Sequence, residues 1–237
     1  MNRDEARSRG PELAPAVQMA PIPWIAPRDS QRGGTWIGVN ARGVVALLLN
    51  GYLPGDTLPR PEPVDIRSRG EIVPRLMTEG STGAMADLLE RRIDPAPFPS
   101  FTIVIADWGA VNAWSWTGSG GLVRSQHDAE WSFFTSSSWN TGEVTAWREH
   151  AFQAWRNDGA QMDGTLPALH VLQPSGLAEW SPLMDRERTS TRSITQVELA
   201  REHGSVIMRY WPRAAIDGDR EPQEFYLPLL REHAVHG

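Results

Sequence analysis

The chain of 237 residues contains no cysteine, which excludes disulfide bonds and thiolate metal sites and leaves the redox compartment open. Lysine is also absent, so all 23 basic residues are arginines. This excludes Schiff-base and P-loop chemistry that depends on lysine. Arginine instead offers a permanently charged, planar group that binds carboxylates well.

Long apolar runs are missing too, because no stretch approaches the roughly 20 residues that a membrane helix needs. The first five residues lack the basic and apolar regions of a secretory signal, so we expect a soluble, cytoplasmic protein with no membrane span. The net charge of −6 argues against nucleic acid as a partner, since phosphate binding depends on clustered cations.

Motifs for common cofactors and hydrolases are absent as well: the sequence has no P-loop, no G-x-G-x-x-G, no G-x-S-x-G and no H-E-x-x-H. The pair His233 and His236 has a metal-like spacing, but it lies in the last five residues, where chain ends are usually disordered. We therefore expect no metal site.

What is present indicates one α+β domain over residues 1–237, since a chain of this length can bury one core. Ser68 and Glu71 have capping-box spacing, and Ser81 can cap a second helix. The runs 35–40, 43–50, 101–107, 113–117, 131–135, 194–199, 205–211 and 224–227 are predicted as strands, and the runs 81–92 and 140–155 as helices. This order favours two packed sheets with helices outside, or another α+β layering.

Two segments carry a family resemblance. Asn2–Glu5 reads NRDE, and Gly33–Gly38 reads GGTWIG. Together they resemble the NRDE family, also called the Transport and Golgi organisation protein 2 family. Four further segments fall in the order and approximate spacing of that family: 68–70, 105–107, 136–138 and 191–193. The resemblance implies a four-layer αββα sandwich similar to N-terminal nucleophile hydrolases.

The same resemblance implies that a strand is missing. In that family the tetrad follows a first β-strand that starts with Met-Cys, and this chain has neither that strand nor a cysteine. We expect a single NRDE-family domain, residues 1–237, that lacks its first strand. We also expect the strand at 44–49, or a neighbour, to show an open edge near the N-terminus, and the protein to self-associate.

Candidate site residues follow from the family pattern. Arg3 and Asp4 match the pair beside the nucleophile in cysteine members, and Arg192 matches the far wall of the pocket. The segment Ser138 to Asn140 matches the one that supplies an oxyanion-hole amide, from the Asn140 side chain or from the backbone. No catalytic nucleophile is present as written, because Met1 followed by Asn2 cannot serve. The expected ligand-binding residues are Asn2, Arg3, Asp4, Glu5, Trp36 and Ser138.

Each of these residues also has a structural interpretation. Arg3 and Asp4 can form a local ion pair, which at a surface contributes about 0–1 kcal/mol. Trp36 can belong to the core, and Asn140 can simply cap a helix. These interpretations stay open beside the functional ones.

Three functions are consistent with the sequence. The first is non-catalytic handling of a small hydrophobic, haem-like or acyl ligand, because family members are linked to haem trafficking and to lipid and acyl-thioester metabolism, and the 11 tryptophans can form aromatic walls. The second is an amide hydrolase of the cysteine N-terminal nucleophile type whose nucleophile strand is absent from this chain. The third is a structural or interaction protein. Haem is the one cofactor that the resemblance suggests.

Overall fold

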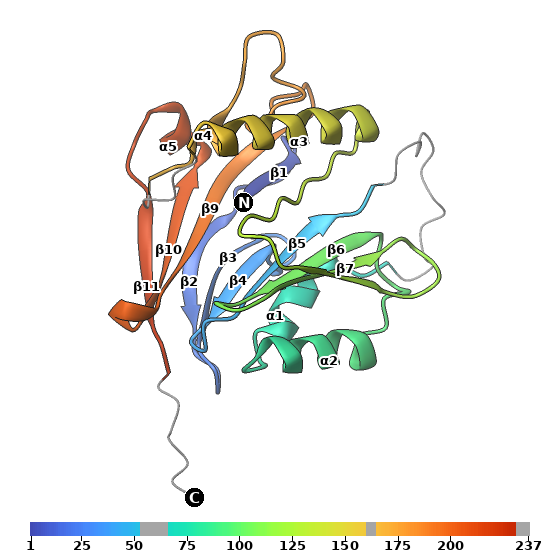
Figure 1. Cartoon of the computed structure of the whole chain (residues 1–237), viewed down its shortest axis with the longest axis vertical. Coiled ribbons are helices and arrows are strands. Elements are labelled where there is room, and N and C mark those ends of the chain that lie inside the picture. The colour runs from blue at the N-terminus through green and yellow to red at the C-terminus, as the bar shows by residue number, and fades with distance from the viewer. Residues whose placement is uncertain (53–65, 160–164, 231–237) are drawn as a thin grey trace, which may run out of the picture.

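The protein folds as two packed antiparallel sheets, as seen in a computed structural model that describes residues 1–52, 66–159 and 165–230 (Figure 1). One sheet has seven strands and the other has four. Helices lie outside the sheets, so the αββα order expected from the sequence is confirmed.

The seven-stranded sheet follows the chain in order, each strand pairing with the next. Its strands are β2 (Leu13–Gln18), β3 (Trp24–Arg28), β4 (Ile37–Asn40), β5 (Val45–Asn50), β6 (Phe101–Ala106), β7 (Val111–Trp116) and β8 (Val123–His127). Short connections join most of these antiparallel strands, whereas residues 51–100, which include helices, join β5 to β6.

The four-stranded sheet joins the two ends of the sequence. Its strands are β1 (Asn2–Ala6), β9 (Thr189–Ala200), β10 (Ser205–Pro212) and β11 (Gln223–Pro228), in the order β1-β9-β10-β11. β1 pairs antiparallel with β9, with a shift of register between Arg3 and Asp4. The NRDE tetrad is therefore the edge strand of this sheet.

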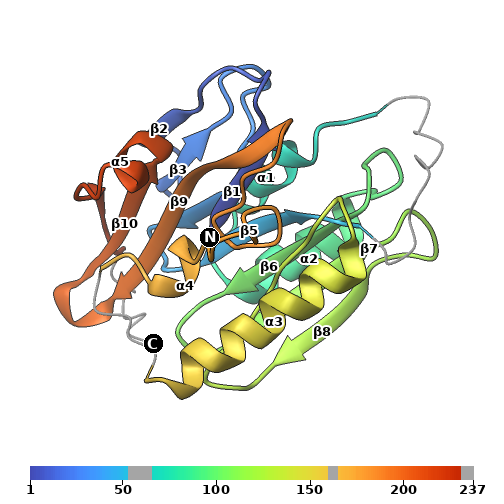
Figure 2. The ribbon, with the colours of Figure 1, turned by 90° about the horizontal axis from the view of Figure 1, so that it is seen from above.

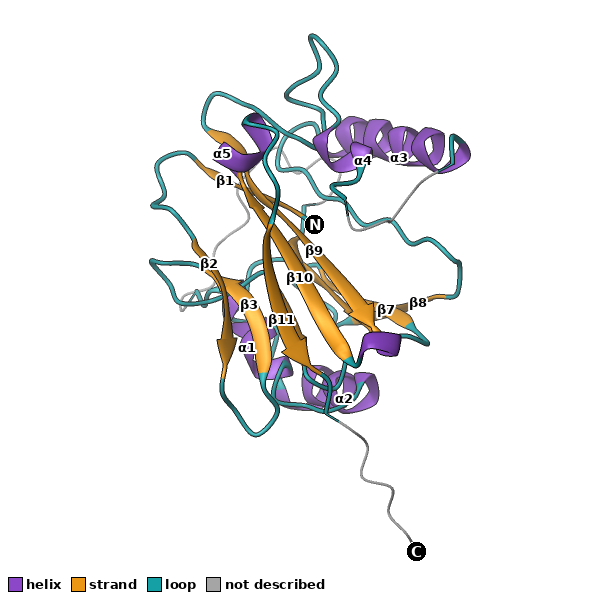
Figure 3. Cartoon of the chain, turned by 90° about the vertical axis from the view of Figure 1, so that its left-hand side faces the viewer, coloured by secondary structure: helices purple, strands orange, loops and turns teal. Residues whose placement is uncertain are grey.

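Helices cover the sandwich unevenly. The helical elements are η1 (Arg69–Glu71), α1 (Ile72–Leu76), α2 (Thr82–Arg92), α3 (Thr141–Asn157), α4 (Ala168–Val171), η2 (Arg201–His203) and α5 (Arg213–Asp217). α1 and α2 pack on the seven-stranded sheet, and α5 contacts β9 and β10. The long helix α3 lies with α4 across one end of the sandwich (Figures 1, 2 and 3).

Two apolar cores hold these layers together. Between the sheets, Ile25 and Val39 of the larger sheet pack in one cluster with Val206, Met208 and Leu227 of the smaller sheet, all at most 4% exposed. A second, larger cluster fills the space between the seven-stranded sheet and helices α1 and α2. Burial of apolar surface on both faces is what fixes the larger sheet between two layers.

Most predicted elements are confirmed, including the cap at Ser81, whose hydroxyl accepts from the backbone N–H of Ala84 at 3.1 Å. One predicted strand is wrong, since 131–135 is not a strand. Residues 13–18 and 24–28 form strands that the local pattern did not predict.

The expected open edge at residues 44–49 is also wrong, because β5 is paired on both sides, with β4 and β6. Among the described residues, the edge near the N-terminus belongs to β1 itself. Self-association of the protein stays a prediction.

Candidate functional site

A cavity of about 730 Å³ opens beside the NRDE strand. Its walls come from β1, β5, the segments 66–70 and 131–138, helices α3 and α4, and the segment 182–189. Residues far apart in the sequence therefore meet around one space, which is large enough for a ligand of drug-like size.

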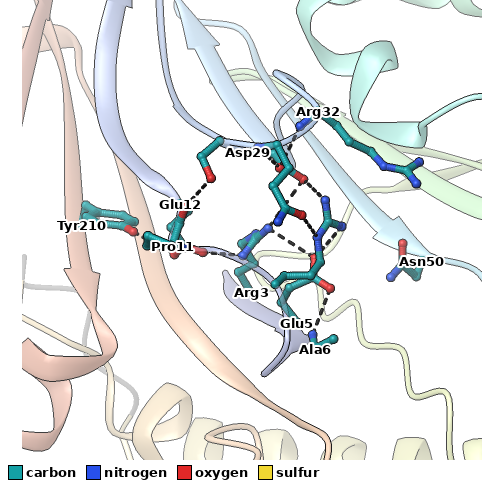
Figure 4. Close-up of polar contacts among 12 residues, drawn as sticks. Arg3, Glu5, Ala6, Pro11, Glu12, Asp29, Arg32, Asn50 and Tyr210 are labelled. Carbon is teal, nitrogen blue, oxygen red and sulfur yellow. Dashed lines mark hydrogen bonds and ion pairs between the residues drawn. The ribbon is translucent and has the colours of Figure 1, made fainter.

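Arg3 anchors a charged network on one side of β1 (Figure 4). Its guanidinium donates to Glu12 and, at 3.3 Å, to Glu5, and it lies 4.2 Å from the centre of the Trp36 ring. Asp29 stands 4.0 Å away. This network fixes the tetrad to β2, β3 and Trp36, because Arg3 is buried and each partner restricts it.

Asp4 behaves differently from Arg3. It has the largest exposed fraction in β1 and lines the cavity, although protein atoms surround its carboxyl closely. The Thr191 hydroxyl donates to it at 2.6 Å. Burial among surrounding protein atoms raises the pKa of Asp4, while Arg148, the Thr191 hydrogen bond and Arg186 act in the opposite direction.

Arg148 comes from the buried face of α3 and is 5% exposed. Its guanidinium donates to the carbonyls of Trp180 at 2.8 Å, Ser181 at 2.9 Å and Ser136 at 3.1 Å. Burial lowers its pKa, and the Asp4 carboxylate raises it. Arg148 thus holds two wall segments together and leaves a positive charge near Asp4.

Arg186 also lines the cavity and is only partly buried. It donates to the Glu179 carbonyl at 2.9 Å and to the Ser137 hydroxyl at 3.1 Å, and it lies 5.1 Å from the Trp139 ring centre. Burial lowers its pKa, with Asp4 as the largest opposing influence. These contacts hold the guanidinium at the wall without an ion pair within the described residues.

Arg69 faces the cavity from η1, on another wall. It donates to the Ser100 carbonyl at 2.8 Å and is hydrogen-bonded to Tyr52. Burial lowers the pKa of Arg69, and Tyr52 is the largest influence that raises it. Tyr52 also interacts electrostatically with Arg186, so two cations from different walls surround the same part of the cavity.

An aromatic wall completes the cavity. Phe133 stacks on Phe152 with ring centres 4.8 Å apart, and Trp131 meets Trp155 edge-on at 5.3 Å. All four residues line the cavity. They give the site an apolar surface against which a hydrocarbon chain or ring can pack.

Asn2 and His170 form a separate polar pair. The Asn2 amide donates to the carbonyls of His170 at 2.9 Å and Pro182 at 2.7 Å, and its oxygen contacts Nδ1 of His170. Burial keeps the pKa of His170 well below 6.5, so its ring is neutral near pH 7. The pair ties the start of β1 to α4.

The structure brings most of the predicted site residues to this cavity. Asn2, Arg3, Asp4, Glu5, Trp36 and Ser138 all line it. Their role in ligand binding stays a prediction.

Asn140 and Arg192, by contrast, are not among the lining residues. Asn140 is exposed and stands at the start of α3 with φ of 43°, outside the lining, whereas Ser138 of the same segment lines the cavity, so an oxyanion hole from this segment stays a prediction. Arg192 sits at the register shift opposite β1, between Thr191 and Ser193, rather than at the far wall of the pocket.

Sequence reasoning missed Arg69, Arg148 and Arg186. For Arg148 a signal exists, because it falls four residues after Val144 and four before Phe152, on the buried face of the helix. A charged side chain on a buried helix face indicates hydrogen-bonding or ionic partners, since burying a charge without them costs much free energy. For Arg69 and Arg186 no local pattern marks the residue.

Charge is distributed unevenly between the cavity and the whole chain. Seven arginine and three carboxylate side chains line the cavity, an excess of four positive charges, whereas the chain carries −6. The arginines are Arg3, Arg9, Arg32, Arg67, Arg69, Arg148 and Arg186, and the carboxylates are Asp4, Glu5 and Asp29. Glu12 and Glu71 lie behind the lining and pair with Arg3 and Arg67, so they offset part of this excess, and the positive charge that remains favours anions.

The described residues offer neither a metal-binding cluster nor a membrane-spanning helix. No group of three or more His, Asp or Glu side chains is arranged to hold a metal ion. None of the helices in the described ranges combines the length and the apolar character needed to cross a bilayer.

Comparison with known proteins identifies the family. The model of the family described as Transport and Golgi organisation 2 matches residues 1–157, more than half of the chain. The chain belongs to this family. The matched part contains the NRDE strand, the GGTW segment and helix α3, so the family sequence builds much of the cavity wall.

Among solved structures, this member of the Transport and Golgi organisation 2 family is similar to penicillin V acylase from Agrobacterium tumefaciens, at 11% identity and a TM-score of 0.49. The similarity covers 95% of this chain and 74% of the acylase. So distant a likeness says nothing of substrate or activity. A comparison with curated proteins finds no match.

Proposed function

We propose that the protein binds a small amphipathic anion, such as a molecule with an acyl chain and an acidic group, without transforming it. The observation that carries this proposal is the pairing, in one cavity of about 730 Å³, of an aromatic wall with an excess of positive charge. Apolar surface supplies most of the affinity in such a site, and a few charged groups fix the orientation.

Two surfaces of the cavity suit two parts of such a ligand. Its apolar part would pack on Phe133, Phe152, Trp131 and Trp155, which already form aromatic pairs. Its acidic group would bind to Arg186, which is held at the wall by neutral oxygens rather than by a carboxylate within 4 Å in the described residues. Arginine binds such groups through directed, charge-assisted hydrogen bonds.

Haem is also an amphipathic anion, since it combines an apolar ring with two carboxylates. The shape of the apolar part distinguishes the two. Competition between them for one site tells which the cavity prefers.

The test uses 8-anilinonaphthalene-1-sulfonate, an aromatic anion whose fluorescence reports binding. Dodecanoate and haemin are then added as competitors, with dodecanol as the uncharged match for dodecanoate. We expect dodecanoate to displace the probe at lower concentration than dodecanol. Equal displacement by the acid and the alcohol would contradict a role for the cationic wall.

A matched pair of variants localises the binding. Arg186→Met should weaken binding of the sulfonate about tenfold or more, since a hydrogen bond to a charged group contributes roughly 1.5–3 kcal/mol. Arg188→Met is the control, because Arg188 is exposed, lies two residues away and does not line the cavity. If both variants bind like the parent protein, the assignment of Arg186 is wrong.

A second function, amide hydrolysis by a longer form of the protein, is favoured by the position of β1. Among the described residues β1 pairs only with β9, and it borders the cavity. We propose that the missing first strand of the domain, with its cysteine, precedes Met1 and pairs with the free side of β1. An in-frame Met-Cys strand upstream in the gene, and N-acyl amide cleavage abolished by changing that cysteine to alanine, would support this function.

Cytoplasmic location and lack of nucleic-acid binding remain part of the proposal. Cell fractionation tests the first, and a gel-shift titration with duplex DNA tests the second. The net charge of −6 is the observation behind the expectation on nucleic acid.

A further inference from the structure

Asp4 occupies an unusual position for a carboxylate, because it faces a cavity whose charge balance favours anions. A ligand with an acidic group must share this cavity with it. Two negative charges side by side repel each other strongly where water is scarce. The ionised Asp4 carboxylate would therefore oppose binding of the proposed anionic ligand.

The groups around Asp4 come from several elements. The Thr191 hydroxyl of β9 donates to the Asp4 carboxyl at 2.6 Å, and the charges of Arg148 on α3 and of Arg186 on the segment before β9 act on it electrostatically. These groups favour the charged carboxylate, whereas burial favours the protonated form.

Other titratable groups nearby are already engaged. The Met1 amine, which also lines the cavity, donates to the Thr195 carbonyl at 2.6 Å, and burial lowers its pKa to about 5, so its titration affects only the acid end of the pH range. On β1 itself, Arg3 and Glu5 bond to each other and to Glu12 and Arg9. His170 on α4 is bonded to Asn2 and is neutral near pH 7, because burial holds its pKa well below 6.5. Tyr52 on another wall is bonded to Arg69. Among the carboxyl groups of the cavity, Asp4 is thus the one that interacts with both Arg148 and Arg186.

A bound anion would change the balance at Asp4. With its acidic group at Arg186, the ligand would compete with Asp4 for the same positive charge and add a negative charge close by. The carboxyl can relieve the repulsion by taking up a proton, and it can keep the Thr191 hydrogen bond when it does so.

We propose that Asp4 determines the specificity of this site by taking up one proton whenever an anionic ligand binds. The inference rests on the proposed function and adds its regulation. Binding of the anion then becomes tighter as the pH falls, while binding of an uncharged ligand does not change. Asp4 acts as a specificity residue and takes no part in breaking bonds.

The experiment measures the dissociation constant of 8-anilinonaphthalene-1-sulfonate between pH 4.5 and 8.5, where the sulfonate stays charged. In the parent protein this dissociation constant should rise by up to tenfold per pH unit. The rise occurs over the pH range in which Asp4 is ionised in the free protein but still protonated in the complex. Asp4→Asn should remove this dependence and bind more tightly than the parent at high pH. Asn keeps an oxygen that can accept from Thr191, so the fold should be retained.

Asp185→Asn is the matched control. Asp185 lies on the segment before β9, pairs with Arg7 and does not line the cavity, so its variant should keep the pH dependence of the parent. Calorimetry in two buffers with different ionisation enthalpies should show proton uptake for the parent and none for Asp4→Asn.

The outcomes separate this inference from the proposed function. A dissociation constant that does not change with pH, or a pH dependence that survives in Asp4→Asn, would overturn the inference while the cavity still binds anions. Failure of the sulfonate to bind at every pH would contradict the proposed function and the inference together.

Discussion

At the scale of single residues, Arg148 shows how a buried charge can organise a site. It stands on the buried face of α3, and its donors reach carbonyls of the segments around Ser136 and Trp180. Arg186 bridges the same two segments through Ser137 and the Glu179 carbonyl, so two guanidinium groups hold this wall, and Arg148 is the more buried of the two. Its charge also reaches Asp4, which couples the shape of the wall to the electrostatics of the cavity.

We predict that Arg148→Met lowers the free energy of unfolding by about 3 kcal/mol or more, because several buried carbonyls would lose a charged donor. Urea unfolding followed by circular dichroism measures this change. Arg156→Met, an exposed position on the same helix, should change stability by less than about 0.5 kcal/mol. Similar losses in the two variants would show that Arg148 does not hold the wall.

At the scale of elements, the close backbone approach of Gly34 and Gly70 positions Arg69. Thr35, next to Gly34, donates its backbone N–H to the Gly70 carbonyl at 3.0 Å, which brings η1 against the entry to β4. A Cβ atom added to Gly34 would lie 2.7 Å from the Gly70 carbonyl carbon and oxygen. Only glycine permits this approach, and it fixes Arg69 beside the cavity.

Replacing Gly34 with alanine should therefore destabilise the protein by at least about 2 kcal/mol, since backbone atoms would have to move apart. Anion binding should weaken as well, because η1 carries Arg69. Gly83→Ala is the contrasting variant: Gly83 lies in α2 with open space around its Cα, and alanine there should be neutral or stabilising by about 0.5–1 kcal/mol. Thermal unfolding of both variants decides the point, and a stable Gly34→Ala protein would refute it.

At the scale of the whole molecule, the contrast between a negative chain and a positive cavity is the main feature. The chain carries −6, yet the cavity walls carry an excess of four positive charges. Distant negative charges are largely screened by salt at about 0.1 M, where the Debye length is roughly 10 Å. The local charge then governs what binds.

Raising the salt concentration from about 0.05 M to about 0.5 M should weaken binding of the anionic sulfonate severalfold, because screening reduces its attraction to the arginines. Fluorescence titration with an uncharged dye such as Nile red gives the comparison and should be nearly unaffected. If salt strengthens binding of both probes equally, burial of apolar surface rather than charge dominates recognition.

The amino-acid sequence by itself determined the family, the layer order and most elements. The NRDE and GGTW segments, the apolar runs of β4 to β7 and the caps of the helices are local patterns, and local patterns are set by neighbouring residues. The lack of cysteine and lysine likewise excluded whole classes of chemistry without reference to the fold.

Only the tertiary structure decided which residues share the cavity. β1 pairs with β9, and the Asp4 carboxyl meets the Thr191 hydroxyl from 187 positions away. Arg69 and Arg186 come from two other segments that local periodicity does not connect. Residue contacts across such separations depend on how the sheets pack. For that reason the family pattern led to the tetrad, which lines the cavity, and also to Asn140 and Arg192, which do not.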